Sequence, residues 1–240
     1  MEGLAGLRTL VTGAAGGIGQ AVVERLVTEG AAVAAADLAA PPPTPAASGL
    51  GGDVTDQDGA AGLVADAREA LGGLDALVLA AGIHWVGPTH EMPVEDFDRV
   101  LAVSVRGTFL CLRAALPGFV EQGSGRVVTF GSTAALVGAP GLTAYSAAKG
   151  AVLNLTRSVA AEYARDGVRA NCLCPGATDT PLLRRLQADR PDPEAFARAH
   201  PIGRYADPAE IAAATAFLLS DDASFFVGSA VVADGGFTAV

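Results

Sequence analysis

The stretch from Leu7 to Glu29 constrains the fold of this chain more than any other part of the sequence. A short apolar run, Leu7 to Thr12, leads into a glycine-rich turn, Gly13 to Gly19, and an amphipathic segment, Gln20 to Glu29, follows at helical spacing. Strand, glycine turn and helix in this order bring backbone N–H groups and a helix N-terminus up to a pyrophosphate. The turn lacks the G-x-G-x-x-G spacing, so an ordinary tight turn is the alternative interpretation.

A carboxylate follows at the distance that a dinucleotide site requires. The next apolar run, Ala31 to Ala36, ends at Asp37, eighteen residues after Gly19, close to the ~20 expected for an acid that binds an adenosine ribose. No Lys or Arg lies in the glycine turn, and Leu38 follows Asp37. A 2′-phosphate would bring negative charge beside Asp37 without a counter-charge, so the pattern favours NAD over NADP. A strand-end turn residue is the alternative reading of Asp37.

Apolar runs alternate with helical patterns along the rest of the chain. We expect strands at Leu74 to Leu79, Arg126 to Phe130, Val168 to Cys174 and Ala230 to Ala233, and helices at Asp56 to Leu71, Glu95 to Glu121, Ala151 to Ala164 and from Asp207 onward. This alternation predicts an α/β fold with a parallel sheet covered on both faces. The stretch Pro41 to Pro45 reads as a rigid surface connection. No linker divides the chain, so residues 1–240 are expected to form a single domain.

The predicted helix from Glu95 to Glu121 has apolar residues over a wide arc of its surface. We expect a break in it near Pro117, because proline lacks the N–H that a helix interior needs. An arc this wide suggests burial on more than one side, and packing against a second subunit would explain it.

The composition excludes several classes of protein. The chain has 240 residues, half of them hydrophobic, which suits one large domain with a substantial core. Its net charge of −10 argues against nucleic acid or an anionic membrane as a partner. No apolar run reaches the ~18 residues of a membrane span, and the N-terminus lacks a secretory pattern. Cys111, Cys172 and Cys174 lack a metal-binding spacing, so we expect no metal site, and buried thiols in a reducing cytoplasm.

Tyr145 and Lys149 are four residues apart, which places them one turn apart on one face if they lie in a helix. A cation held there favours the phenolate of a tyrosine whose ordinary pKa is ~10. Lowering that pKa by ~3 units requires roughly 4 kcal/mol of differential stabilisation, which one ammonium together with a desolvated cofactor could supply. Such a tyrosine can exchange a proton with an alcohol oxygen near neutral pH. An ordinary helix start with a surface lysine is the alternative.

Five motifs, taken together and in order, resemble those of the short-chain dehydrogenase/reductase family. They are Thr12-Gly-x-x-x-Gly17-x-Gly19, Ser132, Tyr145-x-x-x-Lys149, Pro175-Gly176 and Asp234-Gly235-Gly236, and they cover essentially the whole chain. The resemblance implies a Rossmann fold with a seven-stranded parallel sheet and helices on both faces. It also implies a nicotinamide dinucleotide cofactor and a homotetramer, or a homodimer.

The resemblance also implies a role for each matching residue. Ser132 would orient the substrate oxygen, Tyr145 would be the general acid/base, and Lys149 would hold the nicotinamide ribose and lower the pKa of Tyr145. The expected cofactor-binding residues are Gly13, Gly17, Ile18 and Gly19 at the pyrophosphate, Asp37 at the adenosine ribose, Asp53 and Val54 at the adenine, Ala81 and Gly82 after the fourth strand, and Pro175, Gly176, Thr178 and Thr180 at the nicotinamide.

Two positions depart from the family pattern. The usual Asn-Asn-Ala-Gly after the fourth strand is here Leu79-Ala80-Ala81-Gly82, which we interpret as a structural variation. Where the family usually has an Asn that anchors a proton-relay water, this chain has Ser104. A serine hydroxyl can still bind a water, so we expect Ser104 to serve as a fourth catalytic residue. The alternative is that Ser104 only hydrogen-bonds to its own helix backbone.

Substrate choice is expected to lie in residues 181–205, in His84 and Trp85, and in Leu136 to Leu142. The residues around Cys172 to Pro181 resemble those of 3-hydroxybutyrate dehydrogenase-like members, and Ala177 to Thr180 also resembles dihydrodiol dehydrogenases. Arg184, Arg185 or Arg204 could hold a carboxylate in a bidentate pair. Against this, Leu142 stands where some hydroxybutyrate-type members have a basic residue, and solvated loop charges are the alternative for the arginines.

The sequence therefore predicts an NAD-dependent oxidoreductase that interconverts a secondary alcohol and a ketone, with Tyr145 as the general acid/base. The favoured substrates are a small hydroxy acid or a cyclic alcohol or dihydrodiol. Two other functions stay open: a regulatory protein that binds NAD without turnover, and an epimerase or dehydratase that uses NAD without accumulating NADH.

Overall fold

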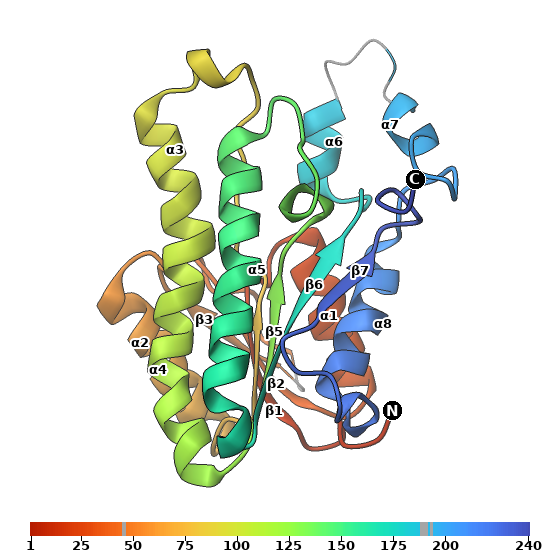
Figure 1. The fold of residues 1–240 in the computed structure, drawn as a ribbon. Coiled ribbons are helices and arrows are strands. Elements are labelled where there is room, and N and C mark those ends of the chain that lie inside the picture. The colour runs from red at the N-terminus through yellow and green to blue at the C-terminus, as the bar shows by residue number, and fades with distance from the viewer. Residues whose placement is uncertain (45–46, 188–191, 193) are drawn as a thin grey trace.

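A computed structural model describes residues 1–44, 47–187, 192 and 194–240. They form an α/β fold around one parallel sheet (Figure 1). Its seven strands are β1 (Arg8–Thr12), β2 (Ala32–Asp37), β3 (Ala47–Gly51), β4 (Ala76–Leu79), β5 (Gly125–Phe130), β6 (Val168–Pro175) and β7 (Ala230–Ala233). They lie in the order β3-β2-β1-β4-β5-β6-β7, and every neighbouring pair is parallel. The predicted fold class, with seven strands, is confirmed.

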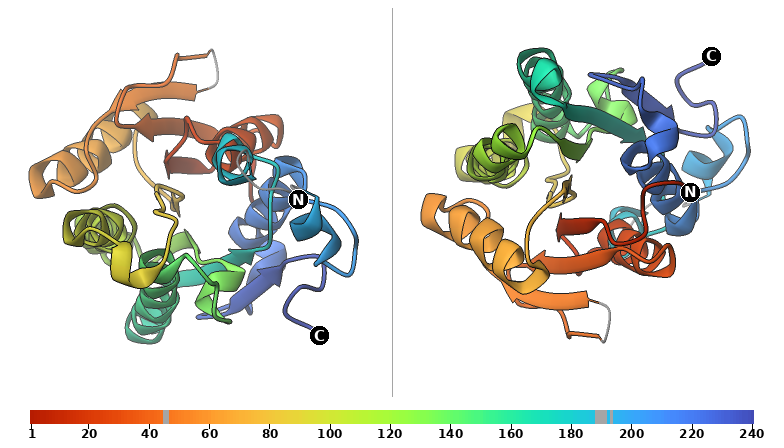
Figure 2. Two further views of the ribbon diagram at one scale, coloured as in Figure 1. Left: turned by 90° about the horizontal axis from the view of Figure 1, so that it is seen from above. Right: turned by 90° about the horizontal axis from the view of Figure 1, so that it is seen from below.

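Helices cover both faces of this sheet because successive strand residues point to opposite sides (Figure 2). The helices are α1 (Gly17–Thr28), α2 (Gln57–Leu71), α3 (Val94–Leu101), α4 (Gly107–Gln122), α5 (Thr143–Tyr163), α6 (Pro181–Gln187), α7 (Ala195–Arg198) and α8 (Pro208–Leu219). Leu10 and Leu77 enter one core, which is packed beneath α2, α4 and α5. Their neighbours Val11 and Val78 enter the other core, beneath α1 and α8. This two-sided burial explains why the strands read as unbroken apolar runs.

Strand β3, from Ala47 to Gly51, was not located from the sequence. It reads Ala-Ser-Gly-Leu-Gly, which lacks the β-branched and aromatic residues that favour strands. Its pairing with β2, in which Ala47 lies opposite Val33, comes from tertiary context rather than from local preference.

The long helical segment differs from the prediction in where it becomes irregular. We expected a break near Pro117, and this was wrong: α4 continues through Pro117. Leu116 and Phe119, which flank the proline, are both buried, and their packing holds the helix in place. The irregularity lies instead at Ala102–Arg106, where a π-helical turn joins α3 to α4 around Ser104.

The same continuous helix, Val94–Gln122, is long and apolar enough by length and composition to cross a membrane, with a mean hydropathy of 1.4. The sequence expectation concerned uninterrupted apolar runs, and Arg106 and Arg113 do interrupt this helix. Half of its most apolar window is buried inside the molecule, and the helix packs against α2 and α5, as core helices that pass the same test do.

Other local predictions are confirmed. Asp207 caps α8 in a capping box with Glu210, and all three cysteines are buried and unpaired. Two helices begin earlier than predicted, α1 at Gly17 and α5 at Thr143. The second of these places Tyr145 in the first turn of α5.

Candidate active site

A cavity of about 490 Å³ opens at the carboxyl ends of the central strands. This is the edge at which open parallel α/β sheets bind their ligands. Many of the residues predicted as site residues line it together: Ile18, Gly82, His84, Ser132, Tyr145, Lys149, Pro175, Gly176, Thr178 and Thr180. The fold thus gathers residues that are far apart in the sequence into one cleft.

The glycine turn beside this cleft has the geometry of a phosphate cradle. Gly13 has a φ of +71°, and a Cβ there would lie 2.6 Å from the backbone nitrogen of Ala81. A Cβ on Gly19 would lie 2.1 Å from the carbonyl oxygen of Gly13. Helix α1 begins at Gly17 with no side chain capping it, so its first N–H groups are free for an anion. These residues fit the pyrophosphate of a dinucleotide.

Asp37 and the residues after β3 lie together beside this turn. The Asp37 carboxylate accepts hydrogen bonds from the backbone nitrogens of Ala15, at 2.9 Å, and Leu38, at 2.8 Å. The Asp37 carbonyl accepts a hydrogen bond from Gly52 N at 3.0 Å, which brings Asp53 and its neighbour Val54 close to the same strand end. Val54 packs against the start of α4, since a Cβ on Gly107 would lie 2.8 Å from its side chain. The arrangement fits an adenosine whose ribose faces Asp37.

Ser132, Tyr145 and Lys149 converge from two elements. Ser132 follows β5, and its hydroxyl accepts a hydrogen bond from Ala134 N at 3.2 Å. Tyr145 and Lys149 lie one turn apart in α5, with the Lys149 ammonium 5.6 Å from the Tyr145 ring centroid. Lys149 donates a hydrogen bond to the carbonyl oxygen of Phe130 at 2.8 Å. Strand β5 therefore fixes both the serine and the direction of the lysine.

Burial dominates the electrostatics of this cluster. Burial raises the pKa of Tyr145, although a hydrogen bond with Ser132 acts in the opposite direction. Burial also lowers the pKa of Lys149 to about 8. Desolvation of the phenolate outweighs the attraction of the Lys149 ammonium, which is directed at the Phe130 carbonyl. The expected lowering of the Tyr145 pKa, which draws on the bound cofactor as well as on Lys149, stays a prediction.

Ser104 lies next to this cluster in the π-helical turn. Its side chain is 1% exposed, and its hydroxyl has no hydrogen-bond partner within the described part of the chain. A Cβ on Gly82 would lie 3.6 Å from the Ser104 hydroxyl and 3.4 Å from the Lys149 ammonium. Both groups therefore lie next to Gly82. The alternative, that the hydroxyl bonds to its own helix backbone, was wrong. Only the Ser104 carbonyl is engaged, accepting a hydrogen bond from the Thr108 hydroxyl at 2.7 Å.

His84 and Trp85, predicted together as substrate residues, are separated by the fold. His84 lines the cavity, with its ring nearly perpendicular to that of Tyr145 and the centroids 6.4 Å apart. Burial lowers the pKa of His84. Trp85 does not line the cavity and packs instead into a small apolar cluster with Val100 and Ala144.

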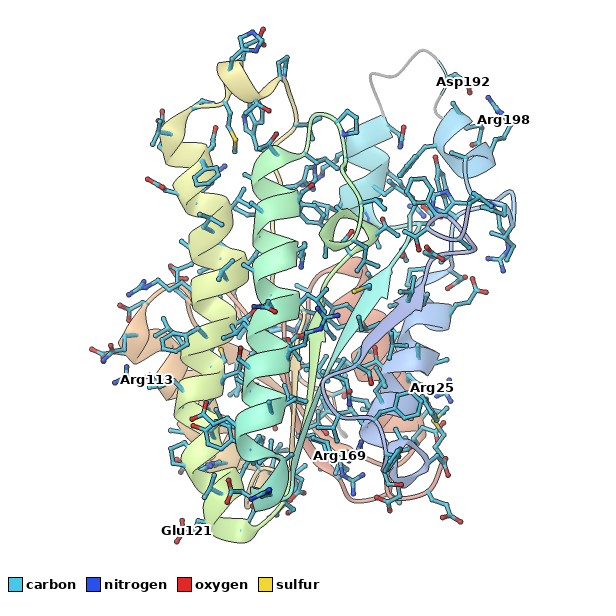
Figure 3. The ribbon with its side chains drawn as sticks, viewed as in Figure 1. Arg25, Arg113, Glu121, Arg169, Asp192 and Arg198 are labelled. Carbon is cyan, nitrogen blue, oxygen red and sulfur yellow. The ribbon has the colours of Figure 1, made fainter. Side chains whose placement is uncertain are left out.

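The predicted arginines do not line the cavity. Arg184 pairs with Asp179, at 2.7 and 3.0 Å, and Arg204 pairs with Glu210, at 2.6 and 2.8 Å. The Arg204 pair lowers the pKa of Glu210 to about 2. Arg185 is exposed on α6. Near α7, Arg198 pairs with Asp192, and both lie at the outer end of the molecule (Figure 3). Partners on this chain therefore occupy the guanidinium groups of Arg184, Arg198 and Arg204.

Comparison with known proteins identifies the family. A family model described as enoyl-(acyl carrier protein) reductase matches residues 13–238. The 2-(S)-hydroxypropyl-CoM dehydrogenase 3 of Xanthobacter autotrophicus is 43% identical over 244 aligned positions, which cover 96% of this chain and 96% of that protein. The chain belongs to the short-chain dehydrogenase/reductase family.

Further members of the family are similar over most of their length. The inactive 2-(S)-hydroxypropyl-CoM dehydrogenase 2 of the same bacterium is 48% identical over 199 positions, 81% of this chain and 86% of that protein. The 2,5-dichloro-2,5-cyclohexadiene-1,4-diol dehydrogenase of Sphingobium indicum is 40% identical across 100% of both chains. The crystal structure of levodione reductase has a TM-score of 0.93 at 34% identity, covering 98% of this chain and 99% of its own. As the sequence predicted, the protein is an oxidoreductase of alcohols and ketones with a nicotinamide cofactor.

In this short-chain dehydrogenase/reductase, the rest of the cavity wall is largely apolar. Its side chains come from four segments and include Val137, Leu142, Leu182, Leu183, Phe196 and Phe237. Most of them fall in the predicted substrate segments, but sequence reasoning missed Phe237. The available signal was the Asp234-Gly235-Gly236 motif just before it. Asp234 accepts hydrogen bonds from Gly236 N and from Thr238, and so folds the terminal segment toward the cleft.

Proposed function

We propose that the protein is an NAD-dependent dehydrogenase of neutral, largely apolar secondary alcohols, cyclic ones above all. The observation that carries this proposal is the lining of the cavity. Ser132, Tyr145 and Lys149 stand on one side, and aliphatic and aromatic side chains form most of the remainder. Within the described part of the chain, Lys149 is the only cationic side chain that lines it. A hydroxy acid would leave its carboxylate without a partner, and burying an unpaired charge is unfavourable.

The chain's own residues divide the proton chemistry between them. Ser132 orients the substrate hydroxyl, and Tyr145 takes its proton as the alcohol becomes a ketone. Lys149 holds the nicotinamide ribose and keeps a positive charge near the phenol. An oxidised nicotinamide, when bound, supplies the hydride acceptor and a further positive charge that favours the phenolate. The apolar wall excludes water from the reacting carbon.

NAD rather than NADP is the proposed cofactor because Asp37 faces the position of the adenosine ribose. The carboxylate is held by two backbone N–H groups, and the glycine turn contains no Lys or Arg to receive a 2′-phosphate. Gly13, Gly17, Ile18 and Gly19 are proposed at the pyrophosphate. Asp53 and Val54 are proposed at the adenine, Ala81 and Gly82 beside the turn, and Pro175, Gly176, Thr178 and Thr180 at the nicotinamide.

The proposed setting is a homotetramer, or a homodimer, in the cytoplasm. Phe109 and Val120, on the outer side of α4, are 47% and 39% exposed, more than an isolated subunit needs to leave in water. Three buried thiols without a disulfide fit a reducing compartment. We further propose that residues 181–205, of which 188–191 and 193 lie outside the described residues, contain the substrate-facing segment of a single domain spanning residues 1–240.

A substrate panel tests this proposal. NADH and NADPH formation are followed with cyclohexanol, cyclohexanediols and 3-hydroxybutyrate, and the corresponding ketones are tested in reverse. We expect turnover of the cyclic alcohols with NAD, and a Tyr145→Phe variant slower by about 10²–10⁴-fold that still binds NAD in a thermal-shift assay. A preference for 3-hydroxybutyrate or for NADP, or near-normal turnover by Tyr145→Phe, would contradict the proposal. NAD binding without turnover in either direction would favour a regulatory role, and product without net NADH would favour an epimerase or dehydratase.

A further inference from the structure

The cavity contains few polar side chains besides Ser132, Tyr145 and Lys149. Two of them, Thr178 and Thr180, are engaged within the chain: Thr178 donates to the Gly176 carbonyl at 3.1 Å, and Thr180 accepts from Leu183 N at 3.3 Å. Thr133 also lines the cavity and is 9% exposed. His84 differs from Thr178 and Thr180, because its ring nitrogens have no hydrogen-bond partner among residues 1–44, 47–187, 192 and 194–240.

The position of His84 makes it a second polar point in the cleft. Its ring stands edge-on to Tyr145 with centroids 6.4 Å apart and an interplanar angle of 85°. A substrate held at Tyr145 therefore shares the cavity with the His84 ring. The surrounding wall is apolar, with Val137 and Leu142 among its side chains, so few other groups can bind a second polar atom of the substrate.

The chemistry of the imidazole limits what that atom can be. Half-burial lowers the pKa of His84, so the ring is mostly neutral near pH 7. A neutral imidazole has one N–H donor and one acceptor nitrogen. It can accept from a hydroxyl or donate to a carbonyl, so it accommodates a second oxygen in either oxidation state. A carboxylate or sulfonate would be better matched by a cation, and His84 does not supply one.

We propose that His84 holds a second, neutral oxygen of the substrate, next to the alcohol that Ser132 and Tyr145 hold. The preferred substrates are then cyclic diols and hydroxyketones rather than simple cyclic alcohols. This inference rests on the proposed dehydrogenase function and deepens it. His84 is a specificity-determining residue in this account, and it takes no part in the proton transfer itself.

The test compares two substrates of similar size that differ in the second oxygen. The kcat/KM with NAD is measured for the cyclohexanediol isomers and for methylcyclohexanols. The readout is the kcat/KM of a diol divided by the kcat/KM of a methylcyclohexanol. For the unaltered enzyme we expect a ratio above one for at least one diol isomer. His84→Phe keeps an aromatic ring against Tyr145 but removes both nitrogens, and we expect the ratio to fall about five- to tenfold, the worth of one neutral hydrogen bond. His84→Gln keeps a donor and an acceptor and is expected to restore part of the ratio.

A matched control is His90→Phe, because the His90 side chain is 83% exposed and does not line the cavity. This variant should keep the ratio of the unaltered enzyme. An unchanged ratio in His84→Phe, or an equal loss with both substrates accompanied by a lower melting temperature, would overturn the role of His84 and leave the dehydrogenase function standing. No turnover of any alcohol by the unaltered enzyme would overturn the proposed function, and the role of His84 with it.

Discussion

At the scale of single residues, Lys149 is held in a site that penalises its own charge. Its side chain is 5% exposed, and its ammonium is hydrogen-bonded to a neutral carbonyl, that of Phe130. Burial therefore brings its pKa down to about 8 from an ordinary 10.5. Groups that lower stability in this way persist where function requires them, which agrees with the proposed role of Lys149 beside Tyr145.

Lys149→Met should therefore give an inactive but more stable protein. The folded state binds fewer protons at Lys149 than the unfolded state between pH 8 and 10.5, so the stability of the unaltered protein rises with pH in that window. At pH 7 the full penalty is present, and we expect the variant to have a free energy of unfolding higher by about 3 kcal/mol. Urea unfolding at pH 7 and near pH 10 measures this. If Lys149→Met were more stable than the unaltered protein by the same free energy at both pH values, the charge of Lys149 would not be the cause of the difference.

Ser104→Ala tests whether the unpartnered hydroxyl carries protons away from Lys149. If Ser104 anchors a relay, removing the hydroxyl should lower kcat by about tenfold or more and shift the pH profile of kcat. Ser104→Asn, which supplies the residue usual in the family, should retain activity. Identical turnover and pH profiles in Ser104→Ala and the unaltered enzyme would exclude a relay through this residue.

At the residue scale, the sequence predicted well the positions of residues that belong to fixed motifs. The positions of Ser132, Tyr145 and Lys149 follow from one strand end and one helix, and spacing along the chain captures both. The pKa of Tyr145 does not follow from spacing, because it depends on how much water surrounds the phenol. The pairing of Arg204 with Glu210 was equally invisible, since it depends on how the turn before α8 folds the Arg204 side chain back onto that helix.

At the scale of elements, the start of a helix was predictable where capping residues mark it. The start of α8 was evident because Asp207, Pro208 and Glu210 each satisfy a local rule. The continuation of α4 through Pro117 and the strand β3 were missed. In α4, the burial of Leu116 and Phe119 overrides the local preference of the sequence, and in β3 the pairing with β2 does so.

The cap of α8 gives an element-scale prediction. Asp207→Ala removes the side chain that accepts a hydrogen bond from Ala209 N at 2.8 Å, and should lower the free energy of unfolding by about 1 kcal/mol. Asp66→Ala, an exposed position inside α2, is the matched control and should change stability little. Chemical denaturation of both variants provides the comparison, and equal stabilities would show that the capping box contributes nothing.

At the scale of the whole molecule, the fold of one chain leaves apolar side chains of α4 exposed. Figure 3 shows Arg113 and Glu121 projecting outward from α4, and the apolar Phe109 and Val120 are also exposed on this helix. A surface of this kind fits the proposed packing against a second copy, which the wide apolar arc of the sequence had suggested.

Phe109→Glu should therefore shift the native mass toward the monomer. A buried interface excludes an unpaired carboxylate, so light scattering after size exclusion should give a smaller particle than for the unaltered protein. Val94→Glu, at a 72% exposed position at the far end of the same continuous helix, is the control and should leave the mass unchanged. A monomeric mass for the unaltered protein would contradict the proposed assembly directly.

The burial of Lys149 also makes the molecule unusual as a target for chemical modification. It is the only lysine among the sixteen basic residues of the chain, the others being arginines. Amine-selective reagents therefore meet just two primary amines, the N-terminus, which is paired with Glu29, and the Lys149 amine inside the cleft. With its pKa lowered to about 8, that amine is partly unprotonated, and thus nucleophilic, near neutral pH. Any label found on a lysine of this protein has entered the cleft, so the extent of labelling reports how often the cleft is open.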